Sequence, residues 1–121
     1  MAMDTTTSVL IPTAGMCEMQ SVELDQVLLL IRLLSEPNRL RLFALLTRGE
    51  RCVCDIQSAT AMPQNLASHH LRVLREAGLI EARRDGRWAY YRVNKAYWAR
   101  IYPALCRLFD PNQMSDAPTR C

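Results

Sequence analysis

The chain has 121 residues, of which 50% are apolar and 22% charged, and its formal net charge is +3. That length suits one small domain and excludes two independent ones. No apolar run reaches the roughly 18 residues that a membrane helix needs, and no basic segment precedes an apolar one at the start, as in a signal peptide. We therefore expect a cytoplasmic protein without a membrane partner, in which residues 21–110 fold between a flexible arm (1–20) and a flexible tail (111–121).

Basic residues are concentrated in one part of the chain. Residues 64–107 carry nine basic residues against three acids, whereas residues 1–63 carry five against seven. All the basic residues except Lys95 are arginines, whose planar guanidinium suits phosphate and guanine. This distribution favours a nucleic-acid-binding surface within residues 64–107.

Two helices are predicted ahead of the basic part. Residues 22–34, VELDQVLLLIRLL, have apolar residues at helical spacing that become nearly continuous, so more than one side of this helix should be covered. A second copy of the chain is the simplest cover. Ser35 is the expected N-cap of the next helix, Pro37 is compatible with its first turn, and Gly49 should end it.

A helix-turn-helix pattern follows. One helix is predicted from Cys52 to about Ala61 and another from Gln64 to Ala77, joined by Met62-Pro63, because a proline lacks a backbone donor. The second helix has a polar, basic outer face, which fits the major groove of DNA. Adjacent histidines on a helix point about 100° apart, so we expect them to contact DNA or pack rather than hold a metal ion. The predicted DNA contacts of this helix are Gln64, Asn65, Ser68, His69, His70 and Arg72.

A β-hairpin is predicted from Leu79 to Val93. Residues alternate on both sides of Asp85-Gly86, a pair that supplies the positive φ angles of a tight turn. Arg83, Arg84 and Arg87 crowd the tip. We expect this hairpin to be a basic wing that contacts the DNA backbone or the minor groove beside the second helix of the helix-turn-helix.

The last predicted helix covers residues 96–109, with Pro103 expected to kink it. Its apolar side is the simplest partner for the helix at residues 22–34 across a dimer. The predicted fold class is therefore mainly α with a β-hairpin wing (α+β), a winged helix-turn-helix that forms a homodimer.

Cysteines are numerous for a chain of this size. Without a secretion signal, an odd number argues against a disulfide framework and leaves metal binding, redox sensing or burial. Cys52 and Cys54 would lie about 200° apart on an ideal helix, so they can grip one ion only at an unformed first turn or by distorting the helix. The helix dipole and nearby arginines should favour thiolates there. Cys106 shares a side with apolar residues and is expected in the core. The five cysteines are Cys17, Cys52, Cys54, Cys106 and Cys121.

The segments SEPNRLRLFALL, RCVCDI, NLASHHLRVLREAGLI and RRDGRWAYYRV resemble the ArsR/SmtB family of metal-responsive repressors, over about residues 22–109. The most specific piece is CVCD at the start of the third helix. The resemblance implies a homodimeric repressor, not an enzyme, that binds double-stranded operator DNA and releases it on binding a thiophilic metal or metalloid ion.

By this resemblance, Cys52 and Cys54 are the metal-binding thiolates of the family's third-helix site. Arsenite sensors add a cysteine three positions later, where this chain has Gln57, whereas the cadmium- and lead-sensing branch adds one from the N-terminal arm, where Cys17 lies. We therefore expect Cd(II) or Pb(II) as the effector, with As(III), Sb(III) and Zn(II) as alternatives. The last helix has no acids or histidines for the family's second zinc site, so none is expected there.

Three other functions are compatible with parts of the pattern. A redox- or persulfide-sensing repressor of the same fold would pair thiols reversibly, and it would need a partner such as Cys17 or Cys106, since cysteines two apart in a helix would close a strained ring. A thiol enzyme such as an arsenate reductase would need a phosphate-type loop around Cys52, a base with a group that orients it, and enough chain to enclose a substrate, and the sequence shows none of these. A DNA-binding module without an effector is the third alternative.

Overall fold

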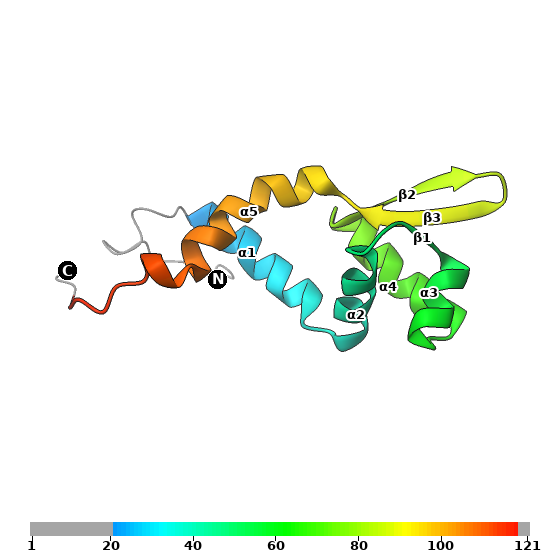
Figure 1. The fold of residues 1–121 in the computed structure, drawn as a ribbon, viewed down its shortest axis with the longest axis horizontal. Coiled ribbons are helices and arrows are strands. Elements are labelled where there is room, and N and C mark those ends of the chain that lie inside the picture. Colours follow the sequence, from blue (N-terminus) through cyan, green and yellow to red (C-terminus); the bar gives the residue numbers. More distant parts are fainter. Residues whose placement is uncertain (1–20, 119–121) are drawn as a thin grey trace, which may run out of the picture. The chain divides into compact units, whose positions relative to one another are not determined.

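The structure is a computed structural model that describes residues 21–118. The predicted winged helix-turn-helix fold is confirmed: within this range there are five α-helices and an antiparallel three-stranded sheet with the strand order β1-β3-β2 (Figure 1). The predicted arm at residues 1–20 and the end of the tail lie outside the described residues. The elements are α1 (Ser21–Leu34), α2 (Pro37–Leu46), β1 (Arg51–Cys52), α3 (Val53–Thr60), α4 (Gln64–Glu76), β2 (Ile80–Asp85), β3 (Trp88–Val93), α5 (Lys95–Phe109) and a 3₁₀ turn (Pro111–Gln113).

The chain divides into two compact units, and the larger, Leu30–Arg100, contains the helix-turn-helix and the sheet. Trp98, from the first part of α5, belongs to this unit: its ring lies 4.8 Å from that of Phe43, and its indole N–H donates to the Leu79 carbonyl at 3.3 Å. Removal of large aliphatic side chains from water stabilises this core. Its fully buried large side chains are Leu42, Ile56, Leu71, Leu74, Leu79 and Ile80.

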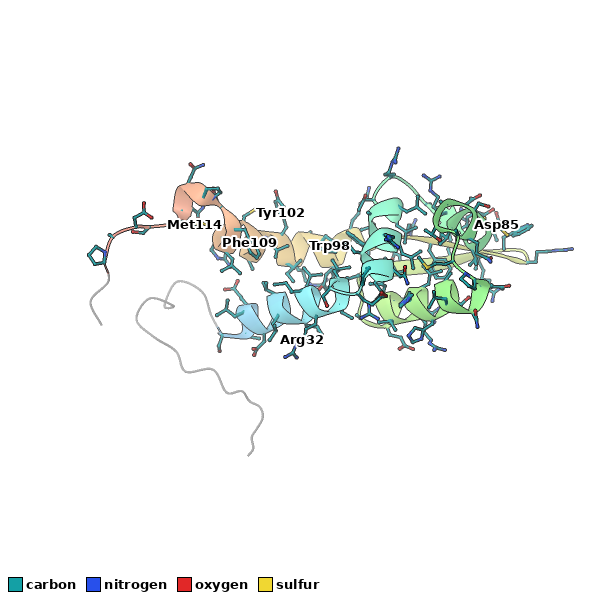
Figure 2. The ribbon with its side chains drawn as sticks, turned by 90° about the horizontal axis from the view of Figure 1, so that it is seen from below. Arg32, Asp85, Trp98, Tyr102, Phe109 and Met114 are labelled. Carbon is teal, nitrogen blue, oxygen red and sulfur yellow. The ribbon has the colours of Figure 1, made fainter. Side chains whose placement is uncertain are left out.

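The smaller unit combines the first turns of α1 with α5 from Ile101 onward. Within it, Arg107 forms an ion pair with Glu23, which joins the two helices. Several large apolar side chains of this unit are exposed, and Figure 2 labels three of them along the end of the chain. Several large apolar side chains exposed in one small unit favour an interaction surface, because monomeric proteins rarely expose extensive apolar area. The exposed large apolar residues of the unit are Val22, Leu28, Leu29, Tyr102, Phe109 and Met114.

The start of α2 differs from the sequence prediction by one residue. Glu36, not Ser35, is the N-cap: its Oε1 accepts the Asn38 N–H at 2.9 Å, and Pro37 follows in the first turn. The Ser35 hydroxyl instead donates to the Arg32 carbonyl at the end of α1, at 2.8 Å. A carboxylate is an effective cap because it accepts a free N–H and also suits the positive end of the helix dipole.

A short strand that the sequence did not predict precedes α3. Arg51 and Cys52 pair with Tyr91 and Tyr90 of β3, so α3 begins at Val53 rather than at Cys52. At its other end, Ala61 has a left-handed backbone (φ 59°) and donates its N–H to the Gln57 carbonyl at 2.8 Å. The predicted turn at Met62-Pro63 follows, and α4 begins at Gln64 as predicted.

The hairpin of β2 and β3 forms the wing, which projects beyond α3 and α4 (Figure 1). Its two-residue loop is Gly86-Arg87, because Asp85 already pairs with Trp88. The loop thus lies one residue later than the predicted Asp85-Gly86 pair. Gly86 has φ 62°, and a turn that needs a positive φ only at its first central residue suits this sequence.

Pro103 lies inside α5 and does not end the helix. None of the helices between residues 21 and 118 is long and apolar enough to span a membrane.

Candidate nucleic-acid interface and thiol site

The exposed face of α4 carries five of the six residues predicted to contact DNA. The helix packs against α2 and α3 through Ala67, Leu71 and Leu74, whose side chains are completely buried. This amphipathic pattern fixes which side of α4 faces solvent. The structure brings the following predicted residues together on the exposed side: Gln64, Asn65, Ser68, His69 and Arg72.

His70 does not belong to this exposed set, contrary to the prediction that it contacts DNA. It is only 5% exposed, and its Nε2 lies 3.1 Å from Oε2 of Glu36 at the start of α2. Burial lowers the pKa of the His70 imidazole, although the Glu36 carboxylate acts in the opposite direction. The backbone N–H of Asn38 lowers the pKa of the Glu36 carboxyl. His70 thus ties α4 to the N-terminus of α2.

The three predicted arginines of the wing have different surroundings. Arg84 and Arg87 are exposed toward the end of the hairpin. Arg83 instead donates to both carboxylate oxygens of Glu50, at 2.9 and 2.7 Å, and its guanidinium lies 4.6 Å from the centre of the Tyr90 ring. This bridge lowers the pKa of the Glu50 carboxyl and raises the pKa of the Arg83 guanidinium, so both groups stay charged.

The two thiols of the predicted metal site lie at the junction of β1 and α3. Cys52 is half-buried and has an extended backbone (φ −82°, ψ 165°) as the residue before the helix, whereas Cys54 is exposed in its first turn. Cys52 is therefore outside the helix, and the 200° separation expected on an ideal helix does not apply to this pair.

The described residues provide only part of a metal-binding set. Two thiols suit a soft ion chemically. No group of three or more His, Cys, Asp or Glu side chains that could hold a metal ion occurs within residues 21–118. The predicted third ligand, Cys17, lies outside the described residues, as does Cys121. Cys106, predicted in the core, is half-buried on α5, where it raises the pKa of the exposed Tyr102 hydroxyl by hydrogen bonding.

Sequence reasoning missed Glu36 and Glu50, the acids that engage His70 and Arg83. Each partner lies more than thirty positions further along the chain, and no local pattern links an acid to a basic side chain at such a distance. Only the pairing of β1 with β3 and the packing of α2 on α4 bring them together.

Comparison with known proteins agrees with this geometry. The family model described as a bacterial regulatory protein of the arsR family matches residues 36–82. An arsenic resistance transcriptional regulator of Pseudomonas putida is 36% identical over 86 residues, which cover 70% of this chain and 67% of the relative. An HTH-type transcriptional regulator of Mycobacterium tuberculosis is 37% identical over 103 residues, 85% of this chain and 45% of the relative. The chain spans about half the length of the first curated relatives that it matches.

Solved structures give the same assignment. A homodimeric winged helix-turn-helix DNA-binding domain from Mycobacterium bovis, described as a possible ArsR-family regulator, is 34% identical. The match covers 90% of this chain and all of that domain, with a TM-score of 0.59. These relatives are transcriptional regulators rather than enzymes. The chain belongs to the ArsR family of bacterial helix-turn-helix regulators.

Proposed function

We propose that this protein is a DNA-binding transcriptional repressor that acts in the cytoplasm as a homodimer and releases its operator when a thiophilic ion binds Cys52 and Cys54. The observation that carries the proposal is the position of two thiols at the start of α3, in a helix-turn-helix whose second helix presents a polar, exposed face. Ion binding at the start of α3 can therefore change the position of α4, the helix that is proposed to contact DNA.

The exposed face of α4 is suited to the major groove of operator DNA. Gln64 and Asn65 lie in its first turn, where amide side chains can pair with adenine, and Arg72 can reach guanine or phosphate. Ser68 and His69 complete the face. The exposed wing residues Arg84 and Arg87 would contact the backbone or the minor groove, which fixes register without reading sequence in detail.

A homodimer is supported by the exposed apolar side chains of the smaller unit, in particular Leu28 and Leu29 of α1 and Phe109 of α5. The Mycobacterium bovis domain is described as homodimeric. Two copies related by a two-fold axis would present two α4 helices to successive major grooves, so the operator should be an inverted repeat.

The effector is proposed to be Cd(II) or Pb(II), with As(III), Sb(III) and Zn(II) as alternatives. Sulfur ligands exclude magnesium and calcium but do not separate these ions. Cys17 is the proposed third ligand, because Gln57 occupies the position that would complete an arsenite site. The Pseudomonas putida relative is named for arsenic resistance, which supports an effector of this chemical class. The ion would supply strong bonds to sulfur. Release of the operator would result from the movement of the residues around the thiols.

Thiol oxidation is a second candidate for the signal. It is favoured by the finding that residues 21–118 supply two thiols at α3 but no set of three potential ligands. In this alternative a two-electron oxidant such as a peroxide would couple Cys52 or Cys54 to a further thiol as a reversible disulfide and would itself be reduced, or a polysulfide would transfer a sulfane sulfur to one thiol to form a persulfide. DNA release would follow this change instead of ion binding. Mass spectrometry after mild oxidation distinguishes it from ion capture.

Operator binding measured by fluorescence anisotropy, with DNA from upstream of the gene, tests the proposal. Cd(II), Pb(II), As(III), Sb(III) and Zn(II) are each added in turn. Cd(II) or Pb(II) should release the wild-type protein, whereas Cys52→Ser and Cys54→Ser should bind DNA normally and no longer respond. Cys106→Ser, a thiol remote from α3 in the sequence, is the matched control and should respond like the wild type. Loss of DNA binding in the α3 variants, or release by no ion and no oxidant, would contradict the proposal.

A further inference from the structure

Arg83 is held on the side of the sheet where Cys52 lies. In the sheet, Tyr90 of β3 pairs with Cys52 of β1 on one side and with Arg83 of β2 on the other. Residues directly opposite each other in antiparallel strands have side chains on the same face. The thiol of Cys52, the ring of Tyr90 and the guanidinium of Arg83 thus form one row across the sheet.

Glu50, which precedes β1, contacts the Arg83 end of this row. It lies two residues before Cys52, and its carboxylate accepts both hydrogen bonds of the Arg83 fork, at 2.9 and 2.7 Å. Arg83 also lies over the Tyr90 ring, 4.6 Å from its centre. The Arg83 guanidinium therefore contacts Glu50, in the segment that carries the Cys52 thiol, and Tyr90 of β3, the strand that lies between β1 and β2. Its positive charge is already paired with the Glu50 carboxylate.

We propose that Arg83 is a positioning residue instead of a DNA contact: with Glu50 and Tyr90 it fixes the wing to the thiol-bearing segment, so that chemistry at Cys52 displaces the wing. This inference deepens the proposed function and rests on it. The packing of α3 on α4 is one connection from the thiols to the proposed DNA-binding surface. The sheet provides a second connection, which leads from Cys52 to the wing surface that holds Arg84 and Arg87.

The two roles of Arg83 predict opposite effects for a change at Glu50. If Arg83 were a phosphate contact held back by Glu50, Glu50→Gln would free it and strengthen operator binding. If Arg83 positions the wing, Glu50→Gln and Arg83→Gln should each weaken operator binding, by about two- to fivefold given the modest strength of exposed ion pairs. The reversed pair Glu50→Arg with Arg83→Glu should restore much of the loss, although it places an acid on the wing.

Glu81→Gln is the matched control. Glu81 accepts a hydrogen bond from Arg92 at 2.9 Å across β2 and β3, so the same wing loses an exposed ion pair and the protein gains the same unit of charge. This bridge does not include the thiol-bearing segment. The control should leave operator affinity within about twofold of the wild type.

Amide hydrogen exchange of residues 80–93, with and without Cd(II) and in the absence of DNA, tests the connection itself. Cd(II) should change exchange in the wing of the wild type and of Glu81→Gln, and the change should be lost in Glu50→Gln and Arg83→Gln. An unchanged Cd(II) response in these two variants, or tighter operator binding by Glu50→Gln, would overturn the inference. A third outcome separates this inference from the proposed function. If Cd(II) neither released the wild-type protein from the operator nor changed its hydrogen exchange, cadmium would be excluded as the effector. The positioning role of Arg83 would still be supported if Glu50→Gln exchanged its wing amides faster and bound the operator less tightly.

Discussion

The two parts of the proposed DNA-binding surface are held in different ways. The helix α4 is anchored by completely buried apolar side chains and by the contact of His70 with Glu36. The wing has a run of exposed residues from position 82 to 88, and exposed ion pairs support its strands. Buried packing is strong and exposed ion pairs are weak, so we expect α4, the proposed reader of the operator, to be the more rigid part and the wing to be the part that a small signal can move.

The largest expected effect is a loss of stability caused by a change in the buried face of α4. Leu71→Ala removes a completely buried side chain from the contact of α4 with its neighbours, and should lower the free energy of unfolding by about 2–5 kcal/mol. Chemical denaturation measures this loss. A loss below about 1 kcal/mol would mean that α4 is not anchored as described.

Reading of bases by α4 should give the next largest effect. Arg72→Ala removes an exposed guanidinium from the face of α4 and should weaken operator binding by about 1–3 kcal/mol if it pairs with guanine. The measurement is affinity for the operator against a scrambled sequence. Equal weakening on both would assign Arg72 to phosphate contact, and no weakening on either would remove it from the interface.

The wing arginines should act through charge alone. Arg84→Ala and Arg87→Ala should each weaken binding to specific and scrambled DNA alike, and should reduce the slope of log affinity against log salt concentration by about 0.9. Titrations at several salt concentrations give this slope. The proposed contrast between base reading by α4 and backbone contact by the wing would fail if these variants changed sequence preference more than Arg72→Ala does.

The smallest effect concerns the anchoring of α4 at mildly acid pH. Burial lowers the pKa of His70 below its usual 6.5, so the unfolded chain takes up this proton at a higher pH than the folded protein. The stabilising contribution is present above about pH 6.5 and should be lost as the pH falls below it. Unfolding measured between pH 7 and 5 should show a steeper loss for the wild type than for His70→Gln, and His69→Gln should follow the wild type.

Much of the fold could be predicted from the sequence because its signals are local. Apolar spacing marked the helices, Pro63 marked the turn before α4, and Gly86 marked the wing to within one residue. The two residues of β1 were not predicted, because a strand this short has no period of its own and exists only by pairing with β3. The sequence also could not show that Glu36 rather than Ser35 is the N-cap of α2, since either of these adjacent residues can cap a helix.

The candidate site was predictable only in part, for a related reason. Residue type and helical position identified the exposed set on α4, but they could not show that His70 turns inward to Glu36 or that Arg83 is already paired with Glu50. Both outcomes depend on acids far away in the sequence. Residue type and position therefore identified the candidate contacts, and the fold decides which of them already have a carboxylate partner.

The most direct test of the account is the affinity of the thiols for Cd(II), measured by thiolate absorption on the free protein and on the protein saturated with operator. Because coupling between two sites is reciprocal, operator DNA should weaken Cd(II) binding by the same factor by which Cd(II) weakens operator binding. A Cd(II) affinity unchanged by saturating operator would show that the thiols at the start of α3 do not control the DNA-binding surface.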